Sequence, residues 1–338
     1  NSVADQTRPY GVYTVKVISG QIQITKKLVK NGNNDPFEVT ENDGQTFTFK
    51  VTKLQDESGT IKNNAESGNP LLDTTFGTNG SKEVTVTIPK GESQVSLKNS
   101  TELQNLPRGI YEVEEVNVPN FELTKAEAAT ETNCYSTSES LKVRFSLGYS
   151  KSDGTNVINN KYEHIGGGQL GVAVYTNKLV TADLKLKKVD ADNMSTLLRG
   201  AEFELEMWTA SKNSWTPVEG ENKFEVDKEK DLKALLPGRY KLTETKAPDK
   251  HALLGSSIYF KVESGKVLLT NEDGTPANNG PSEMWTLAKA DNGGQVLTIK
   301  NTGIYELPSA GGNGIYWYMI GGMVLMSTAA WILYKNKC

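Results

Sequence analysis

Residues 236–248 read LPGRYKLTETKAP and show a pattern that recurs along most of the chain. The Pro237-Gly238 pair is a turn signal, and the alternation after it is typical of a β-strand with one apolar face. On that face Tyr240 and Leu242 are followed, at the same parity, by Glu244. A carboxyl group there is unexpected, because burying an unpaired charge is costly.

This segment is the second of three sequence segments that occur in the same order in both halves of the chain. In the second half the order is LKLKKVD (184–190), LPGRYKLTETKAP (236–248) and LTIKNTG (297–303). In the first half it is IQITKKLV (22–29), LPRGIYEVEEV (106–116) and VINNKY (157–162). A repeat of this length indicates a duplicated domain rather than a short solenoid unit.

Other alternating apolar runs, such as Phe47-x-Phe49-x-Val51, are separated by turn signals at the spacing of a β-sandwich. The sequence therefore predicts an all-β chain with two tandem immunoglobulin-like β-sandwich domains. We expect an N-terminal segment at 1–19, the first domain at 20–163, a linker at 164–179 around a Gly-Gly-Gly run, and the second domain at 180–303.

Composition excludes several function classes. The 338 residues carry 37 Lys+Arg against 41 Asp+Glu, a net charge of −4 that offers no footprint for nucleic acid. Two cysteines and two histidines leave little material for a metal site or for Cys/His catalysis, so we expect no metal and no cofactor. The chain reads as a non-enzyme.

Residues 315–334 form a charge-free stretch, IYWYMIGGMVLMSTAAWILY, followed by Lys335 and Lys337. Its length and basic end predict a C-terminal transmembrane helix within 304–338, with the preceding chain outside the cell. No signal peptide is visible at residue 1, so the numbering is taken as that of the mature protein. Cys134 would then have no disulfide partner outside, because Cys338 lies beyond the basic residues.

Strand parity predicts that one Lys, one Glu and one Asn of each domain point toward the core. In the first domain these residues are Lys26, Glu115 and Asn160, with Lys27, Glu114 and Asn159 as rivals one residue away. In the second domain they are Lys188, Glu244 and Asn301. The alternative is that parity slips near the strand ends and that these groups lie at the rim.

Burial would give these three groups a shared chemistry. It lowers the pKa of a lysine and raises that of a glutamic acid, so a neutral amine faces a protonated carboxyl group. A neutral amine is a nucleophile, and a carboxyl group can relay protons. Attack on the asparagine carboxamide would release ammonia and leave a Lys–Asn isopeptide bond. By analogy with disulfides, such a bond would restrict the unfolded chain.

At this point the sequence resembles the sortase-assembled pilins of Gram-positive bacteria. Residues 180–303 resemble the Cna B-type domain in Lys188-Val189-Asp190, in GAEFEL (200–205) and in the E-box LPGRYKLTE (236–244). The first domain is similar to the isopeptide domains of streptococcal two-domain backbone pilins. The resemblance implies bonds Lys26–Asn160 and Lys188–Asn301, with Glu115 and Glu244 as the catalytic proton relays.

Two further motifs resemble parts of this family. Leu307-Pro308-Ser309-Ala310-Gly311 is similar to the LPxTG sorting signal, with alanine in place of threonine, which implies cleavage between Ala310 and Gly311. The segment VAVYTNK (172–178) resembles the segment that carries the polymerisation lysine, which makes Lys178 the candidate. Lys151 is its rival, and an ordinary surface lysine is the alternative to both.

These resemblances imply a structural subunit of a covalently polymerised surface pilus, with the backbone pilin as the first choice. The implied partners are neighbouring pilin subunits, a class C-type pilus sortase, peptidoglycan through a housekeeping sortase, and a host matrix protein. The implied location is the cell wall. An accessory or basal pilin, or a monomeric wall-anchored adhesin, is the alternative.

Overall fold

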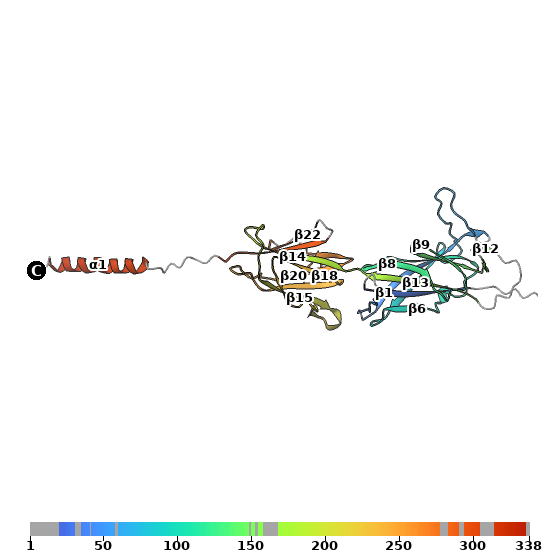
Figure 1. Cartoon of the computed structure of the whole chain (residues 1–338), viewed down its shortest axis with the longest axis horizontal. Coiled ribbons are helices and arrows are strands. Elements are labelled where there is room, and N and C mark those ends of the chain that lie inside the picture. The colour runs from blue at the N-terminus through green and yellow to red at the C-terminus, as the bar shows by residue number, and fades with distance from the viewer. Residues whose placement is uncertain are drawn as a thin grey trace, which may run out of the picture.

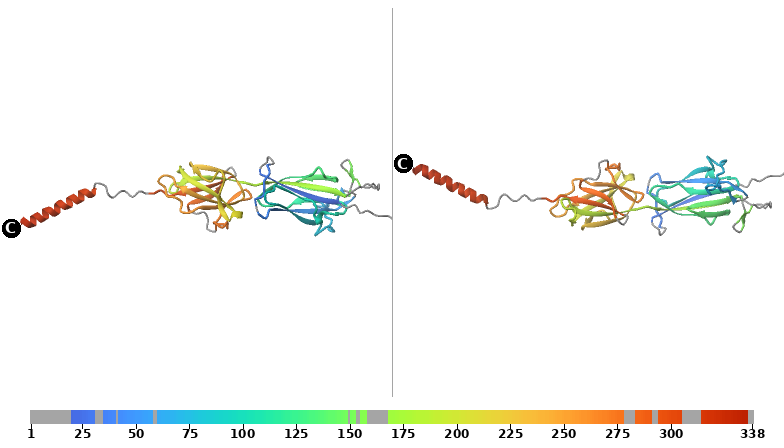
Figure 2. Two further views of the ribbon diagram at one scale, coloured as in Figure 1. Left: turned by 90° about the horizontal axis from the view of Figure 1, so that it is seen from below. Right: turned by 90° about the horizontal axis from the view of Figure 1, so that it is seen from above.

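The computed structural model describes residues 20–30, 35–40, 42–57, 60–148, 150–152, 155–157, 168–277, 283–290, 294–304 and 314–335. Most of them lie in β-strands, and the strands form two β-sandwiches, each around a hydrophobic cluster of its own. The sandwiches lie end to end along the long axis of the molecule, as Figures 1 and 2 show. The all-β prediction is confirmed.

The first sandwich packs a four-stranded sheet against a five-stranded sheet. The four-stranded sheet has the order β6 (Gln94–Leu97), β1 (Gly20–Val29), β13 (Gln169–Leu179) and β8 (Phe121–Ala128). The five-stranded sheet has the order β5 (Ser81–Ile88), β2 (Gln45–Leu54), β7 (Gly109–Glu115), β10 (Lys142–Leu147) and β9 (Tyr135–Glu139).

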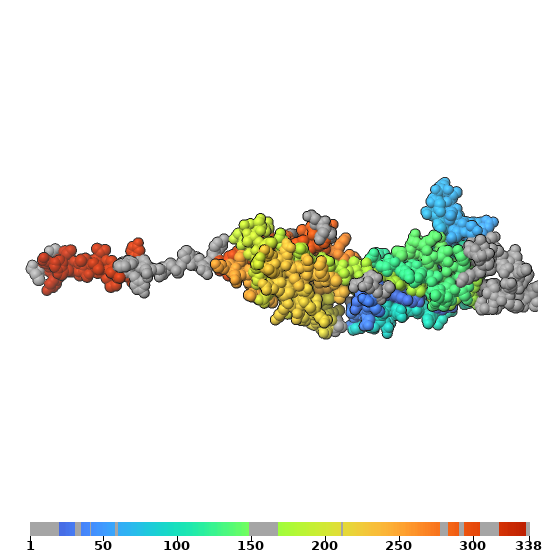
Figure 3. Space-filling view, in the orientation of Figure 1, coloured from blue at the N-terminus to red at the C-terminus, as the bar shows by residue number. Residues whose placement is uncertain are grey.

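Smaller elements decorate the first sandwich. The hairpin β3 (Asp56–Glu57) and β4 (Thr60–Ile61) lies in the light-blue excursion that projects from the body between β2 and β5 (Figure 3). The others are the 3₁₀ turn η1 (Thr101–Leu103) and the hairpin β11 (Ser150–Ser152) and β12 (Thr155–Val157).

The core of the first sandwich follows the predicted alternation. Phe47, Phe49 and Val51 are fully buried on β2, and their neighbours on the strand are more exposed except near its end. Cys134 is buried in the same cluster, where its thiol donates to the Leu170 carbonyl at 3.6 Å. A large apolar interior of this kind supplies the main driving force for folding.

The second sandwich also packs two sheets. One has the order β18 (Glu229–Leu235), β14 (Ala182–Asp190), β23 (Gln295–Asn301) and β22 (Trp285–Lys289). The other has the order β16 (Ser214–Pro217), β15 (Ala201–Thr209), β19 (Gly238–Lys246), β20 (Ile258–Glu263) and β21 (Lys266–Leu269). β17 (Phe224–Val226) pairs with β15, and η2 (Ala210–Lys212) is a short 3₁₀ turn.

The position of β13 corrects the predicted linker at 164–179. β13 runs parallel to β1 through their whole length, from Gly20 opposite Gln169 to Val29 opposite Lys178. It is therefore the last strand of the first sandwich. Gly171 belongs to its core, since a Cβ there would lie 2.6 Å from the Phe145 ring. Glycine is required where another group approaches the backbone this closely.

Val180 and Thr181 are thus the whole connection between β13 and β14. Two turns meet beside this connection. The Ser264 amide donates to Asn120 Oδ1 at 2.7 Å, and the Val180 amide donates to the Asn120 carbonyl at 2.9 Å. Asn120 and Ser264 both have positive φ, at 70° and 49°, as tight turns require. These hydrogen bonds fix the ends of the sandwiches to each other.

The charge-free C-terminal stretch forms a helix, α1 (Gly314–Lys335). No helix in the part of the chain that the structure describes combines the length and the apolar character that a membrane crossing requires. The predicted transmembrane helix is therefore not found.

Candidate functional site

Three polar side chains meet in the core of the second sandwich. Lys188 of β14 and Asn301 of β23 are 0% exposed, and Glu244 of β19 is 4% exposed. The Lys188 amine contacts Asn301 Oδ1 directly and lies 3.4 Å from Glu244 Oε1. Asn301 Nδ2 donates to Glu244 Oε2 at 2.9 Å. The structure brings together all three residues that the sequence assigned to this site.

Strand register explains this meeting. β14 and β23 are parallel neighbours in which Lys188 lies opposite Ile299, so Asn301 is two residues farther along. A shift of two residues keeps a side chain on the same face of the sheet. Glu244 comes from the facing sheet, where it lies opposite Phe203 of β15. The lysine and asparagine therefore share one inner face, and the glutamate approaches from the other.

A second set of the same three residue types lies in the first sandwich. The Lys26 amine of β1 is 2.7 Å from Glu115 Oε2 of β7, and the two side chains are 0% and 2% exposed. Asn177 of β13 donates from Nδ2 to Glu115 Oε1 at 2.5 Å. Asn177 Oδ1 is buried and has no hydrogen-bond partner among the described residues.

The two sets are arranged alike. Lys26 lies opposite Tyr175 in the parallel pair of β1 and β13, so Asn177 is again two residues beyond the lysine's partner. Glu115 lies opposite Phe49, as Glu244 lies opposite Phe203. This shared register makes Asn177 the counterpart of Asn301.

Asn177 differs from the predicted asparagine. Asn160 and its rival Asn159 lie outside the described residues, and the amide beside Glu115 belongs to Asn177. A signal for Asn177 was present in the sequence. Ala173-x-Tyr175-x-Asn177 matches Leu297-x-Ile299-x-Asn301 in polarity and spacing, but the glycine run had assigned the segment to a linker.

The neighbouring lysine and glutamate point elsewhere. Lys27 is exposed on the outer face of β1. Glu114 is 30% exposed and pairs with Lys142 at 2.6 Å and with Lys50 at 3.8 Å. The inward parity therefore belongs to Lys26 and Glu115.

Burial changes the acid–base properties of both lysines. It lowers the pKa of Lys26 from 10.5 to about 8, although the Glu115 carboxylate acts in the opposite direction. It lowers the pKa of Lys188 to about 8 in the same way, against the effect of Glu244. The cause is the cost of a charged ammonium group away from water. Each amine therefore loses its proton far more readily than an exposed lysine.

A tyrosine anchors each glutamate-bearing strand four residues before the glutamate. The Tyr111 hydroxyl donates to the Pro107 carbonyl at 2.7 Å, and the Tyr240 hydroxyl donates to the Leu236 carbonyl at 2.8 Å. Both rings are buried, so each hydroxyl needs such a partner. These bonds fix the start of β7 and of β19 against the turn that precedes it.

The remaining predicted positions are placed as follows. Lys178 lies on β13, is 35% exposed, and pairs with Glu122 of β8 at 2.8 Å. Lys151 lies in β11, opposite Asn156 of β12. The sorting-like signal at 307–311 lies outside the described residues. Within the described ranges, no three His, Cys, Asp or Glu side chains are grouped so that they could hold a metal ion.

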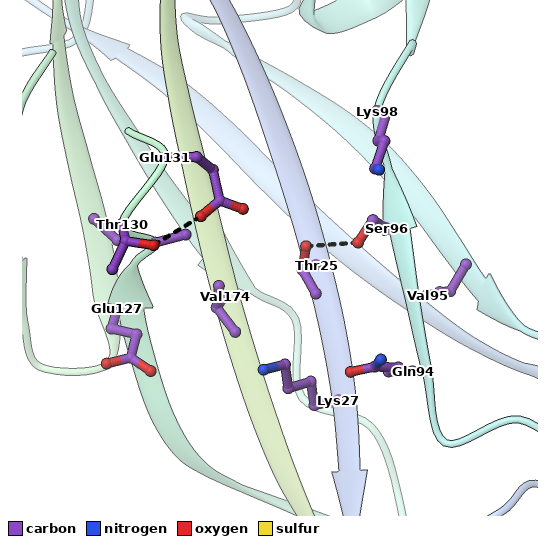
Figure 4. Close-up of a pocket in the computed structure, with 12 residues that line it drawn as sticks. Thr25, Lys27, Gln94, Val95, Ser96, Lys98, Glu127, Thr130, Glu131 and Val174 are labelled. Carbon is purple, nitrogen blue, oxygen red and sulfur yellow. Dashed lines mark hydrogen bonds between the residues drawn. The ribbon is translucent and has the colours of Figure 1, made fainter. Parts of the chain in front are cut away.

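A shallow groove of about 690 Å³ lies on the outer face of the four-stranded sheet of the first sandwich. Figure 4 shows its lining, in which Thr25 bonds Ser96 at 2.8 Å, and Thr130 bonds Glu131 at 3.2 Å. Lys27 reaches into it, whereas Lys26 points to the opposite face of the sheet. The groove and the buried triad are separate features of the first sandwich.

Comparison with known proteins finds a similarity for the second sandwich. The model of the SpaA prealbumin-like fold domain matches residues 182–275. No curated protein sequence matches the chain.

Several solved structures are similar to most of the chain at low identity. The C-terminal fragment of pilus adhesin SpaC from Lactobacillus rhamnosus GG is 18% identical, with 86% of this chain and 99% of that chain covered and a TM-score of 0.45. The major pilin T-13 from Streptococcus pyogenes is 16% identical, with 86% and 100% covered and a TM-score of 0.36. The Bacillus anthracis TIE protein is 16% identical, with 87% and 37% covered and a TM-score of 0.40.

The family match covers β14 through the hairpin of β20 and β21, including Lys188 and Glu244. The second sandwich therefore resembles the SpaA prealbumin-like fold domain over residues 182–275, in agreement with the resemblance read from its sequence.

Proposed function

We propose that this chain is a structural subunit of a covalently assembled surface pilus, of the backbone type, in which each sandwich cross-links itself through a Lys–Asn isopeptide bond. The observation that supports this most is the pair of buried triads with one strand register. Buried charged groups are rare unless they are paired or functional. Two such sets in the same arrangement point to a shared chemistry.

The proposed reaction is balanced within each triad. The neutral amine of Lys188 attacks Cγ of Asn301, the Cγ–Nδ2 bond breaks, and ammonia leaves. Glu244 accepts the proton that the amine loses and returns one to the departing nitrogen, so its own protonation is unchanged at the end. In the first sandwich Lys26, Asn177 and Glu115 have the same roles. The reaction occurs once per site, so the chain is not an enzyme.

Mass spectrometry tests the cross-links. The folded recombinant chain should weigh less than its sequence by two ammonia molecules, and peptide mapping should join Lys26 to Asn177 and Lys188 to Asn301. Glu244→Gln should restore one ammonia, and Glu115→Gln the other. Each variant thus serves as the control for the other site. A wild-type chain of full calculated mass would rule out the bonds, and a peptide joining Lys26 to Asn160 would restore the assignment made from the sequence.

A backbone pilin also needs a second reaction, which joins one subunit covalently to the next. We propose that a sortase cleaves between Ala310 and Gly311 and transfers the Ala310 carbonyl to a lysine of the next subunit. Lys178 remains the candidate, with Lys151 as its rival. The partial exposure of Lys178 supports the choice, although its amine must first leave Glu122.

Surface extracts of the producing cells test this role. Polymers that survive boiling in detergent should form a ladder, which Lys178→Arg should abolish and Lys151→Arg should leave intact. The reverse result would assign the joint to Lys151. A single band from the wild type would instead indicate an accessory or basal pilin, or a monomeric wall-anchored adhesin.

A further inference from the structure

The segment 248–254, which is part of the connection between β19 and β20, contacts the second triad directly. The Ala252 carbonyl accepts a hydrogen bond from Asn301 Nδ2 at 2.8 Å. The Leu254 amide donates to Glu244 Oε2 at 2.9 Å. Two of the three reacting groups are therefore held by the backbone of this one segment.

These two bonds restrict the orientation of the reacting groups. The carboxamide nitrogen of Asn301 has two hydrogens, and its acceptors are the Glu244 carboxylate and the Ala252 carbonyl. With both hydrogens directed away from Lys188, the carbonyl side of the amide faces the lysine amine, as the contact to Oδ1 shows. The bond from Leu254 occupies Glu244 Oε2, while Oε1 lies 3.4 Å from the amine.

A histidine and an aspartate hold this segment in place. His251 Nε2 lies 3.0 Å from Asp190 Oδ2, and the side chains are 13% and 22% exposed. His251 Nδ1 lies 2.8 Å from the Asp249 carbonyl within the segment. Asp190 is the last residue of β14, the strand that carries Lys188, and it lies opposite Asn301 in the register. The pair therefore ties the segment to the end of β14, while the Ala252 amide, which donates to the Thr302 carbonyl at 2.9 Å, ties it to the residue after β23.

We propose that His251 and Asp190 are positioning residues for the second cross-link. By holding segment 248–254, the pair keeps the Ala252 carbonyl and the Leu254 amide on the groups that react. This inference rests on the proposed self-cross-linking and adds the residues that set its rate. Neither His251 nor Asp190 touches the reacting atoms, so both act through the backbone of segment 248–254, which does contact them.

The first sandwich offers an internal control. In its described part Asn177 Nδ2 bonds to Glu115, and Asn177 Oδ1 has no partner. No backbone carbonyl comparable to that of Ala252 contacts the Asn177 amide among those residues. A change at His251 should therefore affect the second site and leave the first unaltered.

The test measures the rate of ammonia loss at each site. The full chain is recovered from inclusion bodies in denaturant, at its full calculated mass and before any cross-link has formed, and is then refolded, quenched at intervals and mapped by mass spectrometry. Because small misplacements of reacting groups slow reactions strongly, His251→Ala should slow the second cross-link by roughly tenfold or more. His251→Gln can still donate to Asp190, so its rate should recover to within about twofold of the wild type.

A control separates positioning from general loss of structure. Lys188→Met cannot form the second bond, so comparing it with Lys188→Met/His251→Ala reports what His251 contributes to folding alone. The proposal requires that the double variant still folds, as judged by circular dichroism, and that the first cross-link keeps its wild-type rate. Equal slowing at both sites, or a wild-type rate at the second site in His251→Ala, would overturn it. A wild type that loses no ammonia would instead show that the cross-linking itself is absent.

Discussion

Removing the second cross-link should cost the second sandwich a large part of its stability. Lys188→Met deletes the amine and keeps an unbranched side chain of similar length in the core. The bond from Lys188 to Asn301 would close a loop of 113 residues. By the chain-entropy relation used for disulfides, a loop of this length is worth about 5 kcal/mol. At about 4 °C per kcal/mol for a domain of this size, the melting temperature should fall by roughly 20 °C.

Two controls isolate the bond from the loss of the buried charge. Lys188→Met leaves the Glu244 carboxylate without its cationic partner, so Lys188→Met/Glu244→Gln removes both charges together. Lys187→Met makes the same substitution one residue earlier, on the half-buried outer face of β14, and should leave the melting temperature nearly unchanged.

Differential scanning calorimetry of the full chain, with intact mass measured on the same samples, gives the result. The wild type must show the loss of two ammonia molecules, and the double variant, in which the first site is intact, must show the loss of one. If the melting temperature of the second sandwich then differs by only a few degrees, the chain-entropy argument is wrong for this fold. In that case the bond would serve the assembled fibre and not the stability of the subunit.

Three smaller predictions follow from the contacts around the sites and the joint. Tyr240→Phe removes the buried hydroxyl that donates to the Leu236 carbonyl at 2.8 Å, so the free energy of unfolding should drop by about 0.5–1.5 kcal/mol in denaturant titrations. Because burial lowers the pKa of Lys26 to about 8, the neutral fraction of its amine grows as the pH is raised toward 8. The rate of ammonia loss at the first site should rise over that range and level off above it. A flat rate profile in refolding experiments between about pH 6 and about pH 8 would contradict the role of the neutral amine. Asn120→Gly keeps the positive φ but removes the acceptor of the Ser264 amide, so small-angle X-ray scattering should show a wider range of angles between the sandwiches, with little change in melting temperature.

Strand parity accounts for what the sequence could predict about the sites. Each strand has two apolar residues at a spacing of two, followed at the same spacing by Lys26, Lys188 or Glu244. Because residues at this spacing share one face of a strand, the polar residue must point inward with the apolar ones. The same rule separates Lys26 from Lys27 and Glu115 from Glu114. Inward direction is a local property of a strand, and a single sequence is sufficient to reveal it.

Which asparagine meets which lysine is not a local property. β1 and β13 are far apart in the sequence, and their pairing depends on the packing of the whole sandwich. The glycines near residue 167 suggested a flexible connection, so β13 was assigned to a linker and Asn177 was not considered. The predicted membrane span relied on the length and the absence of charge of 315–334, and no helix in the described part of the chain is long and apolar enough for such a span.

The two-residue connection between β13 and β14 has a mechanical consequence. With both proposed bonds formed, residues 26–177 and 188–301 become two closed covalent rings. A force on the chain ends therefore cannot extend the residues inside either ring. Between the rings, a stretching force acts only on residues 178–187. Most of these residues already lie in β-strands at about 3.3 Å per residue, close to the limit of a straight chain. A subunit built in this way would transmit tension as a nearly inextensible tether rather than absorb it by unravelling.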